Sequence, residues 1–156
     1  MHSYRLLGIS LRAAQQKKKE MSLLKKLQIG NNEIGRYTEN YLLMDYQCHT
    51  CRHHNEHRPD ADKYCERIDL TVVAPGRENI HLYDWFISQA PESGRILIEL
   101  PPNTKQDAES KEVQFEDATV YALEEEFHFN KDRVRKLKLS IVAEEVKING
   151  VVFNRI

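Results

Sequence analysis

The sequence predicts a mainly β protein: a small antiparallel β-barrel of six to seven strands with one flanking α-helix. Three observations predict this class. After Met21 the apolar residues mostly recur with a period of two, which is typical of strands with one buried face. Turn-forming residues separate these segments, and only residues 79–89 change to a helical period. The chain shows no repeat of 20–50 residues, so closure of antiparallel strands around one core is the natural solution.

The first expected strand lies in LLKKLQI, where Leu23, Leu27 and Ile29 share one face. Gly30-Asn31-Asn32 is a turn sequence, and a second strand, rich in Tyr and Leu, is expected over residues 34–46. Residues 47–64 show no periodicity, which predicts a long loop or a hairpin extension.

A third strand is expected over residues 66–73, ending at Ala74-Pro75-Gly76. Residues 79–89 predict a helix that begins at an Asn79 N-cap and closes one opening of the β structure. The expected apolar stripe of this helix consists of Ile80, Tyr83, Phe86 and Ile87, widened by Leu82 and Trp85.

The C-terminal half predicts strands over residues 95–100 and 113–127, the second of them bent near Asp117-Ala118. Residues 134–148 predict one further long strand. Asn149-Gly150 is a tight-turn sequence, and residues 151–153 form a short return.

Composition favours one folded domain over residues 21–156. Of the 156 residues, 40% are hydrophobic and 30% are charged, and 23 Lys and Arg oppose 24 Asp and Glu. This near-zero net charge offers no case for a nucleic-acid partner or an anionic membrane surface. No apolar run approaches the roughly 20 residues of a membrane span. Residues 1–20 predict an N-terminal extension, interpreted as a flexible tail or an over-called start before Met21, with a docking arm as the alternative.

The three cysteines, Cys48, Cys51 and Cys65, cannot all pair within one chain, which argues against a secreted disulfide scaffold. A reducing cytoplasm is expected, and the first 20 residues do not form a convincing signal peptide because their lysines follow the apolar stretch.

The same region holds the densest chemical cluster of the sequence. Cys48, Cys51, His57 and Cys65 could form a Cys3His zinc site that staples the 47–64 segment. A solvated, His-rich loop with incidental cysteines is the alternative, and a redox Cys-x-x-Cys lacks its usual βαβ setting. Because the spacing matches no zinc motif, no metal ligand and no cofactor are assigned.

Catalytic motifs are missing from the sequence. Glu124 and Glu126 share a strand face, and Lys136 and Lys138 share another, so cross-strand ion pairs or solubility charges explain them. Neither a phosphate-binding glycine loop nor a nucleophile elbow is present. No catalytic or cofactor-binding residue is expected, and we predict that the protein is not an enzyme.

Several segments match a known family in their order and spacing. They are MSLLKKLQI, Arg58-Pro59, ERIDLTVVAPGRENIHLYDWFIS, GRILIEL, and KEVQFEDATVYALEEEF followed by LKLSIVAEEVKINGV. Over residues 21–153 the chain thus resembles the type VI secretion tube proteins, the haemolysin-coregulated proteins, particularly their Bacteroidetes branch. Tyr64, Cys65 and Glu66 stand where that family often has glycines, which leaves open a main tube subunit or a divergent paralogue.

The resemblance implies hexameric rings that stack into a tube, with the 47–64 loop as our first choice for the ring-to-ring contact. It also implies sheath, baseplate and spike proteins and secreted effectors as partners. Assembly in the cytoplasm followed by secretion without a signal peptide is expected. The alternative is a non-assembling binding or effector-adaptor module on the same barrel, with a zinc-stapled Cys/His loop.

Overall fold

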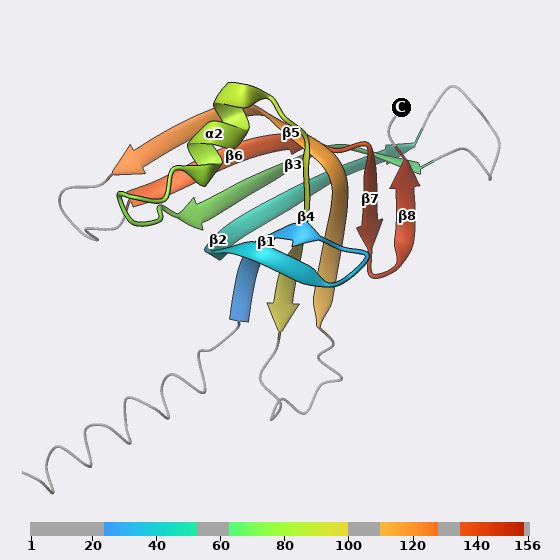
Figure 1. Ribbon diagram of the computed structural model, residues 1–156. Helices are drawn as coiled ribbons and strands as arrows, with labels where there is room; N and C mark the ends of the chain where they lie inside the picture. Colours follow the sequence, from blue (N-terminus) through green and yellow to red (C-terminus); the bar gives the residue numbers. More distant parts are fainter. Residues whose placement is uncertain (1–23, 53–62, 100–109, 128–134, 155–156) are drawn as a thin grey trace, which may run out of the picture.

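The computed structural model describes residues 24–52, 63–99, 110–127 and 135–154. The elements follow one another as strands with one helix between the third and fourth of them (Figure 1). They are β1 (Leu24–Asn31), β2 (Arg36–Arg52), β3 (Lys63–Val73), α2 (His81–Ser88), β4 (Glu92–Glu99), β5 (Lys111–Phe127), β6 (Arg135–Val142), β7 (Glu145–Ile148) and β8 (Val151–Asn154).

All the described strands belong to one sheet, in the order β2-β1-β4-β5-β6-β3-β8-β7. An additional pairing of β2 with β3 closes the first six of these into a ring, and β7 and β8 extend the sheet beside it. The predicted class is therefore confirmed, with eight described strands against the six to seven expected. The long strand β2 pairs with β1 and β3, and the long strand β5 pairs with β4, β6 and β7. These shared pairings let a small sheet close on itself.

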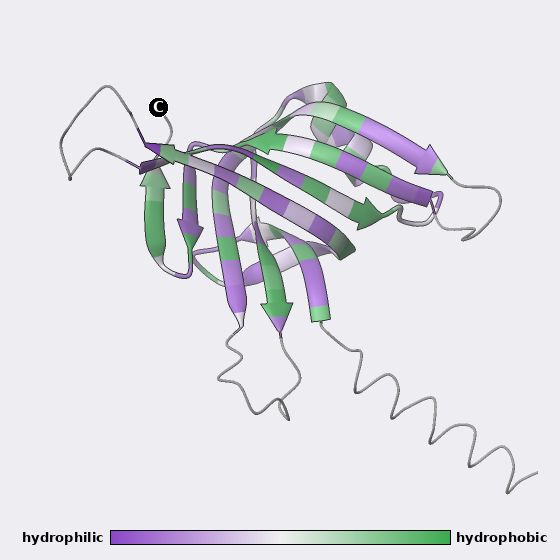
Figure 2. Ribbon diagram, turned by 180° about the vertical axis from the view of Figure 1, so that it is seen from behind, coloured by the Kyte–Doolittle hydropathy of each residue, from purple (hydrophilic) through white to green (hydrophobic). Residues whose placement is uncertain are grey.

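The core lies inside the ring and follows the period of two. Figure 2 shows apolar and polar residues alternating along the strands. Within β3, Ile68, Leu70 and Val72 are buried as expected, and in β1 Leu27 and Ile29 are buried. Burial of such side chains contributes about 25 cal/mol per Å² of apolar surface, which is the main stabilisation of a chain this size. No side chain of a polar or charged residue is buried among the described residues.

The bend predicted in β5 lies at Asp117, whose φ is +51°. Before the bend, residues 113–116 pair with β7; after it, residues 119–127 pair with β6. The single strand predicted over residues 134–148 is therefore wrong. It is divided at residues 143–144 into β6 and β7, because a straight partner cannot follow a bent strand.

The helix is where it was expected, and its buried face is the expected one except for two isoleucines; Tyr83 and Phe86 pack half-buried against the core. α2 covers residues 81–88 and packs on β5, with Leu82 and Trp85 buried. Ile80 and Ile87 of the predicted stripe are 56% and 74% exposed. The cap position is Ile80 rather than Asn79, although Asn79 Oδ1 accepts a hydrogen bond of 3.1 Å from the His81 amide.

The segment 47–64 is largely a hairpin extension. β2 continues to Arg52, β3 begins at Lys63, and the two pair from Leu43↔Val72 out to Arg52↔Lys63. The loop interpretation is thus wrong for residues 47–52 and 63–64. Residues 53–62, like the extension at residues 1–20, lie outside the described part of the chain.

The Asn149-Gly150 turn is confirmed, with φ of +48° and +84° at its two central residues. Positive φ at both positions fits the twist of the flanking strands. The predicted return forms β8, which pairs with β7.

Candidate functional site

The three cysteines lie on the extended β2–β3 hairpin. Cys48 is paired with Ile68, and Cys51 with Tyr64, while Cys65 lies opposite Thr50 beyond a bulge. Cys65 is 6% exposed, whereas Cys48 and Cys51 are partly exposed. All three are free thiols.

Burial makes two of these thiols poor nucleophiles. It raises the pKa of Cys48 to about 11, against the opposing charge of Lys111, and the pKa of Cys65 to about 12. A thiolate is the form that attacks disulfides and binds metals. Both groups therefore remain protonated at neutral pH, which is the behaviour of small apolar core residues.

The zinc alternative finds no support in the part of the chain that the structure describes. There, no group of three or more His, Cys, Asp or Glu side chains could hold a metal ion. His57, the fourth ligand of the hypothetical Cys3His set, lies outside the described residues.

A polar network covers the outer face of β2, β3 and β6. Asp69 lies at its centre, with Oδ1 accepting from Ser140 Oγ at 2.8 Å and Oδ2 lying 2.9 Å from His49 Nε2 and 3.3 Å from Arg67 Nε. Burial acts to raise the pKa of Asp69, but the hydrogen bonds from Ser140, His49 and Arg67 together hold it below its ordinary value. The carboxylate joins three strands, and sequence reasoning missed this set because His49, Asp69 and Ser140 are far apart in the chain.

The predicted carboxylate and lysine rows face each other across β5 and β6. Glu124 is paired with Lys138, and Glu126 with Lys136. A salt bridge of 3.1 Å joins Lys138 Nζ to Glu126 Oε2. The ion-pair interpretation of these rows is confirmed.

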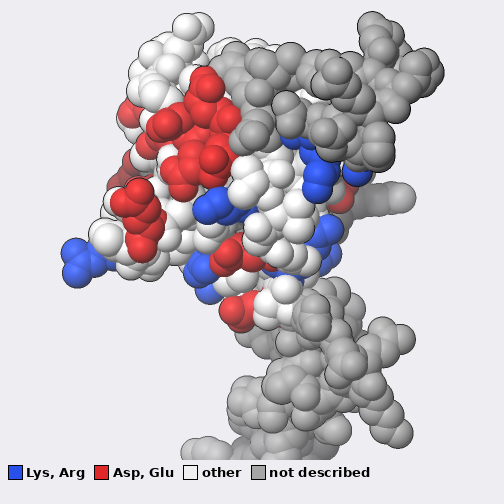
Figure 3. Space-filling model, turned by 90° about the vertical axis from the view of Figure 1, so that its right-hand side faces the viewer, with Lys and Arg blue, Asp and Glu red and all other residues white. Residues whose placement is uncertain are grey.

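Exposed apolar side chains gather at two places on the strands. On β1 and β2 they are Leu24, Leu42 and Met44; on β8 they are Val151 and Val152. Several acidic residues lie close together on β5 and at the start of β7, the strand next to β8. Glu116 pairs with Glu145, and the Glu144 amide donates to the Glu116 carbonyl oxygen. Figure 3, seen from the side of β7 and β8, shows acidic side chains gathered beside an uncharged surface.

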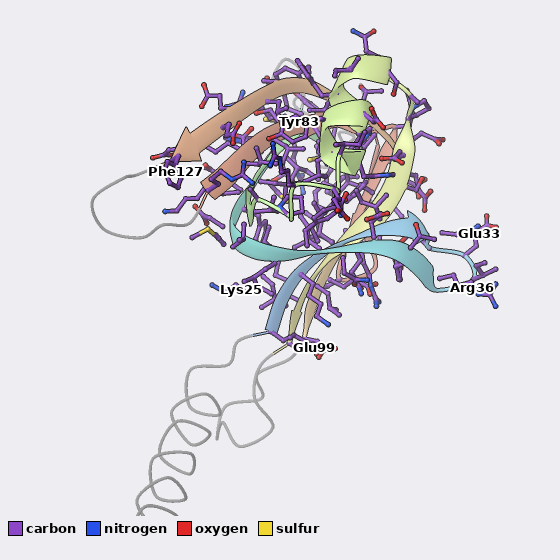
Figure 4. All side chains as sticks on the ribbon, turned by 60° about the vertical axis from the view of Figure 1, so that its left-hand side comes forward. Lys25, Glu33, Arg36, Tyr83, Glu99 and Phe127 are labelled. Atoms are coloured by element: carbon purple, nitrogen blue, oxygen red, sulfur yellow. The ribbon has the colours of Figure 1, made fainter. Side chains whose placement is uncertain are left out.

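The turn between β1 and β2 projects from the ring of strands. Figure 4 shows Glu33 and Arg36 at its tip. At the base of the turn, Asn32 Nδ2 donates to the carbonyl oxygens of Gly94 and Phe115, at 3.0 and 3.2 Å. The projection is thus fixed to β4 and β5.

No helix among residues 24–52, 63–99, 110–127 and 135–154 has the length and apolar character of a membrane span.

Comparison with known proteins gives the same fold. Hcp1 from Flavobacterium johnsoniae superimposes with a TM-score of 0.62 at 16% identity, over 85% of this chain and 99% of that one. Hcp1 from Salmonella typhimurium gives a TM-score of 0.56 at 10% identity, over 80% of this chain and 84% of that one. No curated protein sequence matches the chain. The model of the family described as haemolysin-coregulated protein Hcp (TssD) matches residues 21–156.

Fold and family match together define a β-rich structural protein of type VI secretion, a class without an enzymatic role. The chain belongs to the haemolysin-coregulated protein family, Hcp (TssD).

Proposed function

We propose that this chain is a subunit of the type VI secretion inner tube, forming hexameric rings that stack and are propelled into target cells with effectors. The observation that carries the proposal is the family match over residues 21–156, which includes every described strand. Assembly is the mechanism, and the proposal assigns no catalytic residue.

The surface of the molecule supports an assembling subunit. Long strands with exposed apolar side chains need partners, or they aggregate. A head-to-tail contact that closes produces a ring. Sheath, baseplate and spike proteins would then surround or cap the tube, and the subunit would be assembled in the cytoplasm and leave the cell with the tube.

Light scattering on a sizing column, with negative-stain images of the peak, tests the proposal. Six-fold rings or short tubes are expected. A monomer at both low and high concentration would refute the tube function and favour the non-assembling adaptor.

Stacking can be tested separately through the β2–β3 hairpin. Removal of residues 54–61 keeps both described strands, whereas removal of residues 50–62 would also remove the last three residues of β2. If the hairpin end contacts the next ring, the shortened protein forms rings but few tubes. Tubes of unchanged length would refute this role of the hairpin end.

A further inference from the structure

The turn between β7 and β8 combines a labile pair of residues with access to water. Asn149-Gly150 is the one Asn-Gly pair of the sequence. Asparagine followed by glycine is the pair most prone to spontaneous deamidation, because glycine has no side chain to hinder attack by its own amide nitrogen. Asparagine is counted among the thermolabile residues. Both residues are exposed, so the water that the reaction consumes can reach them.

The chemistry of this reaction involves the two turn residues and water alone. The Gly150 amide nitrogen loses its proton to solvent and attacks Asn149 Cγ, which forms a C–N bond and closes a succinimide ring. The bond from Cγ to Nδ2 breaks, and Nδ2 leaves as ammonia. Water then opens the ring at either of its carbonyl groups, which gives aspartate or isoaspartate. One water molecule is consumed and one ammonia is released, without oxidation or reduction.

Hydrogen bonds to β5 hold the Asn149 side chain in the folded protein. Val113 pairs with Ile148, so Glu112 and Asn149 occupy the next position of the β5–β7 ladder. The Asn149 amide donates to the Glu112 carbonyl oxygen at 2.9 Å, and the Glu112 amide donates to Asn149 Oδ1 at 3.0 Å. The side-chain oxygen thus replaces a backbone carbonyl in an antiparallel pair that exchanges two hydrogen bonds. Ring closure has to break this bond.

The backbone of the turn opposes the reaction as well. The Gly150 nitrogen approaches Asn149 Cγ only if the chain rotates about the Asn149 Cα–C bond. Ile148 and Val151 are paired on either side of the turn, and φ values of +48° and +84° fit this two-residue connection. The rotation would separate Ile148 from Val151. The closed hairpin therefore prevents ring closure.

The hairpin that gives this protection is a minor element of the fold. β7 and β8 have four residues each and lie beside the ring of six strands (Figure 1). On the side away from β7, the described residues give β8 a single bridge, between Tyr64 and Asn154. Val151 and Val152 are 46% and 42% exposed, so they contribute little apolar burial. A segment with few buried contacts opens locally at a lower cost than the whole domain.

We propose that Asn149 is a modification site, at which spontaneous deamidation is gated by the opening of the β7–β8 hairpin. The isoaspartate product makes the opening permanent. In this product the chain runs through the former side chain, so the backbone gains a methylene group within a two-residue turn. Ile148 and Val151 then lose their register. The inference goes beyond the proposed function and does not depend on it.

Mass spectrometry of tryptic peptides from the full chain measures the reaction. Cleavage after Lys147 and Arg155 isolates INGVVFNR, in which Asn154 is an internal reference because the arginine after it hinders ring closure. Folded protein and protein in guanidinium chloride are incubated in parallel at mildly alkaline pH. Deamidation of Asn149 should be at least about ten-fold slower in the folded protein, which corresponds to an opening cost of about 1.4 kcal/mol.

Two Val→Ala variants locate the gate. Val146 of β7 is 2% exposed and Val120 of β5 is 3% exposed, so the two changes remove similar buried side chains. Val146 pairs with Phe115 and Phe153, whereas Val120 pairs with Ile141 on β6. Val146→Ala should speed deamidation in the folded protein about ten-fold, because it weakens the docking of β7 on β5. Val120→Ala is the matched control and should leave the rate close to that of the wild type.

Three outcomes would overturn the proposal. An intact Asn149 in the unfolded chain would show that the turn is not a modification site. Equal rates in folded and unfolded wild type would show that the hairpin gives no protection. Equal acceleration by the two variants would show that the reaction passes through global unfolding. If circular dichroism shows that Val146→Ala does not fold, the comparison of folded and unfolded wild type still tests the gate.

Discussion

Trp85 Nε1 donates a hydrogen bond of 2.9 Å to the backbone carbonyl oxygen of Ala118, inside the core. Ala118 immediately follows Asp117, where β5 bends with a positive φ. The Trp85 ring also stacks on Phe115, with centroids 6.1 Å apart. The Trp85 side chain of α2 therefore donates the hydrogen bond to a carbonyl group at the bend and packs against Phe115, which precedes the bend.

Replacement of Trp85 by Phe should lower the free energy of unfolding by about 2–3 kcal/mol. The change leaves the Ala118 carbonyl group buried without its donor and removes part of a buried side chain. Urea unfolding followed by circular dichroism measures the loss. Tyr83→Phe is the control, because its hydroxyl contacts exposed Glu125 at 3.4 Å and should matter by less than about 0.5 kcal/mol. Equal effects of the two changes would contradict the role given to Trp85.

Gly94 lies where β1 and β4 approach too closely for a side chain. A Cβ atom there would overlap the carbonyl oxygen of Gln28 and lie 2.9 Å from Phe115 Cζ. Gly94→Ala should destabilise the protein by about 2–3 kcal/mol, because the Gln28 carbonyl oxygen belongs to the backbone of β1 and cannot move aside as a side chain could. At Gly76 a Cβ atom meets nothing within 4 Å, so Gly76→Ala should be close to neutral. Thermal melts of the two variants give the comparison, and equal melting temperatures would refute the clash.

The sequence was sufficient for most of the strands and most of the core, because a period of two follows directly from a half-buried sheet. It was not sufficient for the division of residues 134–148 into β6 and β7. It was sufficient for part of α2. Ile80 precedes the helix and Ile87 lies in its last turn, so both are exposed, whereas Leu82 and Trp85 are buried and Tyr83 and Phe86 pack half-buried against the core. The hairpin extension could only be an alternative to a long loop, because residues 47–52 and 63–64 pair through the backbone without apolar alternation.

The candidate surfaces could not be predicted because they depend on register. Leu42, Leu43 and Met44 are consecutive apolar residues, and only the pairing of β2 shows that Leu43 is buried while its neighbours are exposed. The Asp69 network likewise brings together residues 71 positions apart. Periodicity predicts which residues alternate, but it does not show which strands become neighbours.

Asp69 should make stability depend on pH in the acid range. Its pKa is lower in the folded protein than its ordinary value of about 3.9. The stabilisation is therefore fully present above that value and is lost as the pH falls through the folded pKa. Asp69→Asn should cost less than about 1 kcal/mol at pH 7, because the group is partly exposed.

The comparison with Asp69→Asn should be made by urea unfolding between about pH 7 and pH 2.5. We expect the difference from the wild type to shrink below about pH 4. Ser140→Ala keeps the carboxylate and removes the donor at 2.8 Å, so it should shift the loss to higher pH. A constant difference across the range would show that Asp69 acts by packing alone.

Thiol reactivity should separate the buried cysteines from an ordinary free thiol. With pKa values of about 11 and 12, Cys48 and Cys65 hold roughly one thousandth and one ten-thousandth of their sulfur as thiolate at pH 8. A thiol-specific disulfide reagent should therefore modify both slowly in the folded protein, and Cys65 the more slowly because it is also 6% exposed. In guanidinium chloride all three thiols should react quickly. Cys65→Ala should remove the slowest phase and leave the others unchanged. Rapid modification of three thiols in the folded protein would mean that the β2–β3 hairpin opens on the timescale of the reaction, which the pairing out to Arg52 and Lys63 argues against.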